Sequence, residues 1–240
     1  MDPRHLSPPE RAAGLGLMSR RTPRTPAALG DLGRVRLSRH FFLRNFLCSE
    51  IGNVDRVPNL PEDPDLAIAA GRGLAENLLE PLVETFGPIE IRSAYRSPTL
   101  NAYGNARQRE GRRGYECASN DWNRAGHIWD LRDADGRMGA CATVAIPWLV
   151  DRLERQGDWR DMAYWLWDHL PFAAALFFPK LSAFNLGWKE EDGRGPERTV
   201  SSYVQPKGRL IRSWETPRAD RAEREDAYAD FPPFRGIRFP

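Results

Sequence analysis

The 240-residue chain contains little cysteine and no long apolar run. Its three cysteines, Cys48, Cys117 and Cys141, are widely spaced and odd in number, which argues against a disulfide framework and against a cysteine-based zinc site. No apolar stretch is long enough to cross a membrane. The N-terminus also lacks the apolar core of a secretory signal. These absences exclude a disulfide scaffold and predict no membrane partner.

The composition is that of a globular protein, with 41% hydrophobic and 28% charged residues. A chain of this length can bury a real core as one domain, and a net charge of +2 predicts no special partner for the whole chain. Residues 1–36 are rich in Pro, Gly and Arg, with seven Arg against three acidic residues. We expect them to form a disordered basic arm. A solvated tail is the commoner role of such an arm, so nucleic acid is not an expected partner.

Periodicity and turn residues predict the elements of the folded part, residues 37–190. Apolar residues at three- and four-residue steps predict a long helix over residues 65–86, with a kink at Pro81. Alternation predicts a strand over residues 89–95. Further elements are expected in chain order: a short helix capped by Ser38, a short helix over 97–101, a polar loop over 104–120, a strand over 127–132, a helix over 140–155 interrupted at Pro147, a helix over 159–170, and a hairpin of strands 173–178 and 182–189.

This order of elements predicts an α+β domain, a small and mainly antiparallel sheet with helices packed on it. Residues 191–240 are polar, and we expect a largely irregular C-terminal tail there, with charge-dense residues 216–230 unstructured or in a loose surface helix. The predicted organisation is therefore an arm, one domain and a tail.

One motif carries a chemical expectation: Ser93-Ala-Tyr-Arg-Ser-Pro-x-x-Asn101. Arg96 stands where the predicted strand ends, and a rigidly held guanidinium is suited to binding a carboxylate through two parallel hydrogen bonds. The structural alternative is a strand followed by a helix cap, with Arg96 in a surface ion pair.

The motif resembles the S-G-Y-R-S-P-x-x-N signature of the zinc D-alanyl-D-alanine carboxypeptidases, whose fold is shared with hedgehog signalling domains. Residues 41–49 also resemble that family's Phe-x-x-x-x-Phe-x-x-Ser helix. The resemblance implies a hedgehog/DD-peptidase-like fold. It also implies that Arg96 faces the ligand, that Ser93 and Tyr95 support it, and that Asn101 belongs to the same substrate-binding set.

Residues 121–131, DWNRAGHIWDL, are similar to the family's zinc-binding pattern S-x-H-x-x-G-x-A-x-D. Gly126 and Asp130 match its Gly and Asp, whereas Asn123 stands in place of the first zinc His. Near the end of the domain, Asn185 occupies the place of the last zinc His, and no acidic residue lies in residues 179–188 to act as the family's general base.

These departures predict a dismantled zinc site. A catalytic zinc needs three protein ligands, an Asn amide oxygen is a poor substitute for imidazole, and without metal or base no nucleophile forms. The resemblance therefore implies an inactive relative that binds a peptide or a carboxylate-bearing, peptidoglycan-like ligand, with Asp130 as a vestigial metal ligand and no cofactor.

Two alternatives stay open. One is an active zinc D,D-carboxypeptidase or endopeptidase with relocated ligands, in which His127, His40 and His169 are candidates to bind metal with Asp130. A paired histidine at the core edge is the commoner role for His127, and His169 has a structural role near a helix C-terminus. The other is a structural or phage-particle component that uses only the fold. The expected location is cytoplasmic or phage-associated, and nothing in the sequence sets the ligand or the oligomeric state.

Overall fold

The computed structural model describes residues 21–155, 157–191, 198–204, 209–214 and 219–235. They form a six-stranded sheet of order β1-β2-β4-β3-β5-β6, in which every neighbouring pair is antiparallel except β3 and β5. The strands are β1 (Glu90–Ser93), β2 (Gly139–Ala145), β3 (Ala174–Phe178), β4 (Ala183–Lys189), β5 (Thr199–Val204) and β6 (Arg209–Trp214). This is the expected α+β architecture with a mostly antiparallel open sheet.

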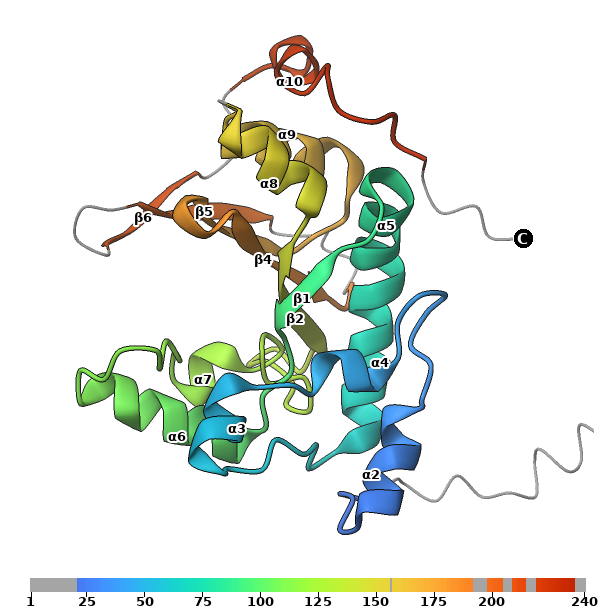
Figure 1. Ribbon diagram of the computed structural model, residues 1–240, viewed down its shortest axis with the longest axis vertical. Coiled ribbons are helices and arrows are strands. Elements are labelled where there is room, and N and C mark those ends of the chain that lie inside the picture. The colour runs from blue at the N-terminus through green and yellow to red at the C-terminus, as the bar shows by residue number, and fades with distance from the viewer. Residues whose placement is uncertain (1–20, 156, 192–197, 205–208, 215–218, 236–240) are drawn as a thin grey trace, which may run out of the picture.

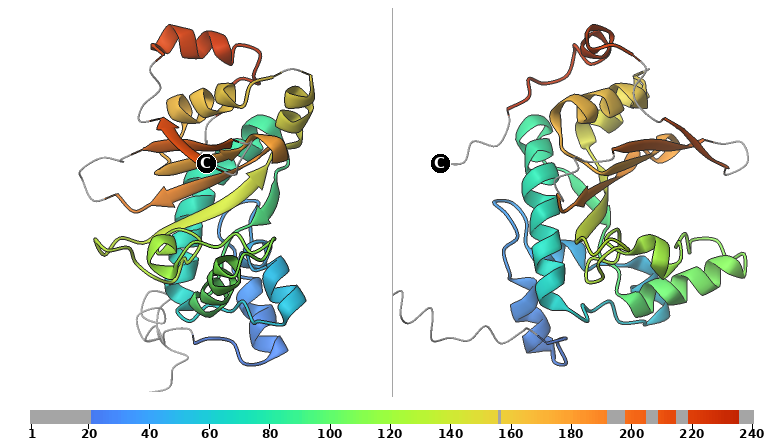
Figure 2. Two further views of the ribbon diagram at one scale, coloured as in Figure 1. Left: turned by 90° about the vertical axis from the view of Figure 1, so that its left-hand side faces the viewer. Right: turned by 180° about the vertical axis from the view of Figure 1, so that it is seen from behind.

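Helices pack on the sheet and gather at both ends of it. They are α2 (Pro26–Gly33), α3 (Glu50–Asp55), α4 (Pro64–Leu74), α5 (Glu80–Phe86), α6 (Pro98–Arg109), α7 (Asn120–Asn123), α8 (Pro147–Glu154), α9 (Trp159–His169) and α10 (Arg221–Ala227). Figure 1 shows α8, α9 and α10 at one end of the molecule and α3, α6 and α7 at the other. Figure 2 shows the same separation from two further sides.

The long helix predicted over residues 65–86 is confirmed as one continuous helical run. It consists of α4, a π-helical segment at Ala75–Leu79, and α5. Asp63 caps its start by accepting a hydrogen bond from the backbone N–H of Leu66. Pro81 lies in the first turn of α5. A π-helical turn pairs each N–H with the carbonyl five residues earlier instead of four. Pro81, which has no N–H to donate, follows directly after this altered stretch of backbone hydrogen bonds.

The core lies between this helical run and one face of the sheet. Strand β2 places Ala140, Ala142 and Val144 on that face, and all three are buried. Leu74 and Leu78 of the helical run are fully buried in the same cluster. Full burial of a side chain of this size contributes about 1.5–3 kcal/mol. Because side chains alternate along a strand, Cys141 and Thr143 point to the opposite face.

The hairpin predicted over residues 173–189 is confirmed as β3 and β4, joined by a 3-10 turn at Pro179–Leu181. Ser182 ends the turn with a φ of 46°. The register pairs Phe177 with Phe184, and their rings stack 5.0 Å apart on the core face. Asn185 falls on the opposite face, beside Thr143 of β2.

The strand predicted over residues 127–132 is wrong. These residues form turns closed by the backbone hydrogen bonds of Gly126 and Ile128 to the carbonyl of Asn123, and of Ala125 to the carbonyl of Leu131. Ile128 and Trp129 are consecutive and both fully buried, whereas consecutive side chains of a strand point to opposite faces. An apolar run of this length therefore resembled a strand without being one.

The helix predicted over residues 140–155, with an interruption at Pro147, is wrong before Pro147 and confirmed from Pro147 on. The segment forms strand β2 and then helix α8, which begins at Pro147. Alanine and valine at every second position fill the slot between β1 and β4, so pairing with two neighbours overrides the helix propensity of alanine. Proline at the first helical position is well accommodated because its fixed φ suits a helix start.

Four boundaries differ from expectation. Ser38 caps no helix, because its hydroxyl donates to Glu80, and a 3-10 turn at Leu43–Phe46 follows instead. Helix α6 extends to Arg109, well into the expected polar loop.

The disorder predicted for residues 1–36 is wrong for α2, which buries Leu32. The irregular tail is wrong for β5 and β6, whereas α10 is the surface helix that the sequence left open for residues 216–230, with no buried residue. Residues 1–20 lie outside the described residues. Within the described part, all three cysteines are free, and no helix has both the length and the apolar character needed to cross a bilayer.

Candidate functional site

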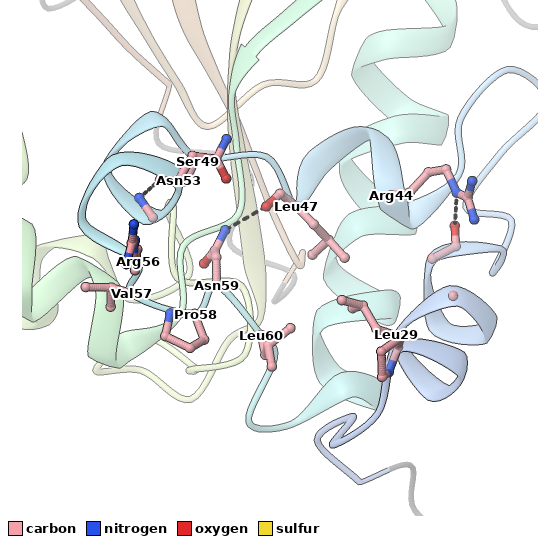
Figure 3. A pocket seen from close by; sticks show the side chains of 14 residues that line it. Leu29, Arg44, Leu47, Ser49, Asn53, Arg56, Val57, Pro58, Asn59 and Leu60 are labelled. Atoms are coloured by element: carbon pink, nitrogen blue, oxygen red, sulfur yellow. Dashed lines mark hydrogen bonds between the residues drawn. The ribbon is translucent and has the colours of Figure 1, made fainter.

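The backbone around Arg96 is held from two sides. The N–H of Arg96 donates to the carbonyl of His127 at 2.8 Å. On the other side, the Asn59 amide donates to the carbonyls of Leu47 and Tyr95 and accepts from the N–H of Ser97. Figure 3 shows the contact from Asn59 to Leu47. Ser97 then caps α6, so the strand end is fixed as the motif predicts.

The guanidinium of Arg96 is half-buried and, among the described residues, its hydrogen bonds go only to neutral groups. It donates to Ser93 Oγ at 3.4 Å and to Cys117 Sγ at 3.2 Å, and it lies 3.5 Å from Asn101 Oδ1. Arg96 forms no ion pair with a carboxylate of the described residues, so the surface ion pair considered from the sequence is absent there. The two contacts to oxygen are long for charge-assisted hydrogen bonds, and no carboxylate of the described residues compensates the charge of Arg96.

A row of polar side chains crosses the sheet next to Arg96. Ser93 of β1 is in register with Thr143 of β2, which is in register with Asn185 of β4. Thr143 donates to Asn185 Oδ1 at 2.6 Å. The amide NH2 of Asn185 has no hydrogen-bond partner among the described residues. The structure thus brings Arg96, Ser93 and Asn185 onto one face of the sheet, away from the core.

Asn123 belongs to a network of side-chain amides beside Arg96. Its NH2 donates to Asn101 Oδ1 at 2.9 Å, and Asn101 in turn donates to Asn120 Oδ1 at 2.8 Å. Asn120 donates to the carbonyl of Pro98, at the start of α6. The network joins α6 to α7, so Asn101 and Asn123 are supporting residues with their hydrogen bonds already made inside the protein.

Asp130 faces a different set of partners. Its Oδ2 accepts from Tyr95 Oη and from the backbone N–H of Glu62, both at 2.8 Å, and Oδ1 is buried with no partner among the described residues. Burial raises the pKa of Asp130 above its ordinary value, although these hydrogen bonds act in the opposite direction. Tyr95 is likewise buried, and its pKa is raised by burial and by Asp130.

His127 is buried and paired with the backbone, as expected. Its Nδ1–H donates to the carbonyl of Ala94 at 2.7 Å. Burial lowers the pKa of His127 to about 3, and the nearby charge of Arg96 acts in the same direction. The imidazole is therefore neutral at physiological pH, and it tethers the turn that follows α7 to the strand end.

Two thiols flank Arg96 and neither is activated. Burial raises the pKa of Cys117, against the effect of Arg96. Burial also raises the pKa of Cys141 to about 12. A thiol must be deprotonated to act as a nucleophile, so the pair supplies no covalent chemistry at neutral pH.

The residues at the expected zinc positions do not fit a zinc ion. Each of Asn123, Asp130 and Asn185 is engaged by other protein groups, and no hydrogen bond links any two of them within the described part. A catalytic site needs three ligands around one point. Among the described residues, no converging group of three His, Cys, Asp or Glu side chains includes Asp130 or His127.

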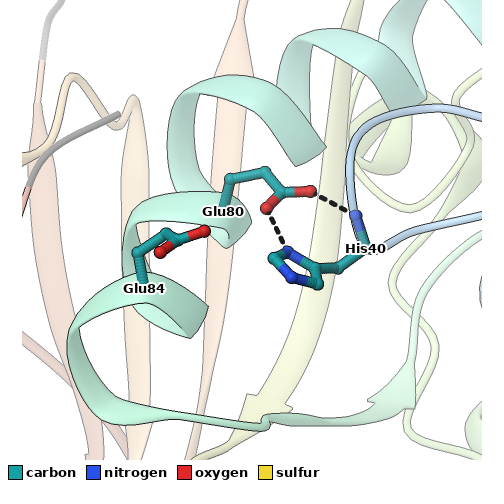
Figure 4. Close-up of side chains that lie close together, drawn as sticks. All are labelled: His40, Glu80 and Glu84. Carbon is teal, nitrogen blue, oxygen red and sulfur yellow. Dashed lines mark hydrogen bonds and ion pairs between the residues drawn. The ribbon is translucent and has the colours of Figure 1, made fainter. Parts of the chain in front are cut away.

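One group that the sequence did not predict does converge: His40, Glu80 and Glu84 (Figure 4). Glu80 accepts from Ser38 Oγ, from the N–H of His40 and from His40 Nδ1, at 2.6, 2.7 and 2.6 Å. Burial alone would raise the pKa of Glu80, but these hydrogen bonds lower it below its ordinary value. Glu84 pairs with Arg39. The carboxylates therefore hold the turn after residue 37 onto α5, and Glu80 and Glu84, four residues apart on a helix, were the available sequence signal.

Comparison of the chain with protein-family models, with characterised proteins and with solved structures finds no match.

Proposed function

We propose that this protein binds the free carboxylate of a peptide, of the kind that ends a peptidoglycan stem, and that Arg96 is the anchor. In this proposal the chain is a catalytically inactive relative of the zinc D-Ala-D-Ala peptidases with a hedgehog/DD-peptidase-like fold. The observation that carries it is the half-buried guanidinium of Arg96, which forms no ion pair with the described carboxylates and donates, among the described residues, to neutral oxygen and sulfur atoms.

A ligand carboxylate would replace these weak contacts with two charge-assisted hydrogen bonds, for which the planar guanidinium is preorganised. The same face of the sheet offers a second recognition group. Asn185 uses its carbonyl oxygen on Thr143, and its NH2 is available to donate to a ligand carbonyl. Ser93 and Asn185 are two strands apart, about 10 Å, which matches the span of roughly three extended residues.

The proposal assigns binding and no hydrolysis. A peptidase of this type needs a metal-bound water and a general base, and the donor set at the zinc positions does not fit. Asp130, the acidic residue that the resemblance places there, is engaged by Tyr95 and Glu62. Asn101 and Asn123 support Arg96 through their mutual hydrogen bond.

The test is calorimetric titration with diacetyl-L-Lys-D-Ala-D-Ala and with its C-terminal amide. We expect the acid to bind at least tenfold more tightly than the amide, because only the acid pairs with Arg96. Arg96→Met should abolish this preference, and Arg96→Lys should weaken it because an ammonium cannot form the paired contact.

Arg109→Met is the matched control, because Arg109 is exposed on α6 and makes no side-chain hydrogen bond or ion pair with the described residues. Asn185→Asp tests the second group without removing the cation, and it should weaken binding of the acid by charge repulsion. Equal affinity for the acid and the amide, or unchanged binding by a folded Arg96→Met variant, would contradict the proposal.

A further inference from the structure

A groove of about 760 Å³ lies between α2, α3 and the segment that follows α3 (Figure 3). Its apolar lining consists of Pro26, Leu29, Leu47, Val57, Pro58 and Leu60. It is separate from the face that carries Arg96, because Asn59 lines the groove while holding the Tyr95–Ser97 backbone behind it. A concave apolar surface with a few polar groups is the usual form of a binding site.

The charged groups in the lining are all of one sign. Arg44 and Arg56 line the groove, and the lining contains no Asp or Glu. Arg44 donates through Nε to the carbonyl of Gly33, at the end of α2, and its two Nη groups have no partner among the described residues. Arg56, at the left-handed end of α3, forms no side-chain hydrogen bond or ion pair with them. Figure 3 shows the two arginines on opposite sides of the groove.

We propose that this groove binds an acidic segment of a partner protein, with apolar side chains against Leu29, Leu47 and Leu60 and carboxylates on Arg44 and Arg56. Two arginines that flank an apolar base complement that pattern of charge. The chain's own N-terminal residues 1–20 are a poor occupant by charge, because they carry three arginines against one Asp and one Glu.

Gly30 allows the groove to be blocked without disturbing the core. It lines the groove from α2, and a Cβ added there would lie 4.0 Å from the nearest atom, Arg34 Nη2. Replacement of a helical glycine does not strain the backbone and favours the helix. Gly30→Trp should therefore fill the groove, and Gly30→Ala is the matched control that leaves it open.

The test uses a displayed library of random hexapeptides, followed by fluorescence polarisation with the labelled peptides that it enriches. We expect enrichment of peptides with apolar centres and Asp or Glu near both ends, at least a tenfold loss of affinity in Gly30→Trp, and little change in Gly30→Ala. The double variant Arg44→Glu with Arg56→Glu should instead select peptides with Lys or Arg at those places.

Arg96→Met should leave the binding of these peptides unchanged, so failure here is distinguishable from failure of the proposed function. The proposal is overturned if no peptide is enriched, if the enriched peptides show no acidic preference, or if Gly30→Trp binds them as the parent does. It is also overturned if the parent is a dimer that Gly30→Trp converts to a monomer, because the occupant would then be a second copy.

Discussion

The hydroxyl of Tyr95 donates a 2.8 Å hydrogen bond to Oδ2 of Asp130, and both side chains are buried. The same oxygen accepts the N–H of Glu62, just before α4. One carboxylate thereby joins the strand end, the turn after α7 and the start of the long helix. The Tyr95 ring also packs edge-on against Trp129, so the junction combines apolar packing with buried hydrogen bonds.

Removal of this carboxylate should be costly. Asp130→Ala leaves the buried Tyr95 hydroxyl without an acceptor and removes the acceptor of the part-buried Glu62 N–H, and we expect a loss of about 2–4 kcal/mol in the free energy of unfolding. Tyr95→Phe removes one donor and should cost about 1–2 kcal/mol. Urea unfolding of both single variants and of the double variant measures the coupling, which we expect to be about 1 kcal/mol. Strictly additive losses would mean that the two side chains act independently.

His127 should make stability depend on pH. The unfolded chain binds a proton at His127 near pH 6.5, whereas the folded chain does so only near the pKa of about 3. The stabilisation that comes from keeping His127 neutral in the folded state is therefore fully present above pH 6.5. It is lost as the pH falls toward 3. Between pH 7 and pH 5 we expect a loss of about 2 kcal/mol. Urea unfolding at several pH values should show a shallower dependence in His127→Gln, and identical slopes would refute a folded-state origin.

Gly71 and Gly30 are both helical glycines, yet replacement by alanine should destabilise the fold at Gly71 and stabilise it at Gly30. A Cβ on Gly71 would lie 2.8 Å from Trp129 Cζ3 and 3.0 Å from Leu37 Cδ1. Trp129 is fully buried, so it has little room to give, and we expect Gly71→Ala to cost about 1–3 kcal/mol. Gly30→Ala meets open space and should stabilise by about 0.5–1 kcal/mol. Thermal unfolding checks both, and a stabilised Gly71→Ala would mean that Trp129 moves freely.

The sequence predicted elements where one period dominates, and it failed where enclosure or strand pairing decided the structure. The helical run through Pro81 and the hairpin before Lys189 carry unambiguous patterns. Residues 127–132 do not, because Ile128 and Trp129 are buried side by side in a turn, so burial follows no two-residue period there. Strand β2 is rich in alanine, and only its two neighbours determine that it is extended.

The candidate site was predictable to a similar extent. The placement of Arg96 follows from two local signals, a strand end and the Ser97 cap, and both can be recognised in the sequence. The partners of Asp130 and of Glu80 come from residues 35 to 68 positions away. No local pattern specifies contacts at such separations, so the burial of Asp130 and the His40–Glu80 contact emerge only when the chain is folded.

A double variant with histidine restored at the two expected zinc-ligand positions tests whether these positions can still bind one zinc ion together with Asp130. Asn123→His with Asn185→His supplies two imidazoles, and Asp130 would be the third ligand of a two-His, one-Asp set. In this structure Asn123 contacts Asn101, Asn185 contacts Thr143, and Asp130 contacts Tyr95 and Glu62. A zinc ligand set must place three donor atoms about 2 Å from one ion, so Asp130 would first have to give up its buried hydrogen bonds.

We therefore expect the parent and the double variant each to retain less than about one tenth of a zinc per chain after dialysis. The parent offers only amide oxygens and a sequestered carboxylate, and the two imidazoles of the double variant lack a third converging ligand. Elemental analysis measures this, and Glu84→Gln in both backgrounds removes any contribution from the His40, Glu80 and Glu84 group. Stoichiometric zinc that appears only in the double variant and survives Glu84→Gln would show that Asp130 can leave Tyr95. The three positions would then retain the geometry of a zinc site once imidazoles are supplied.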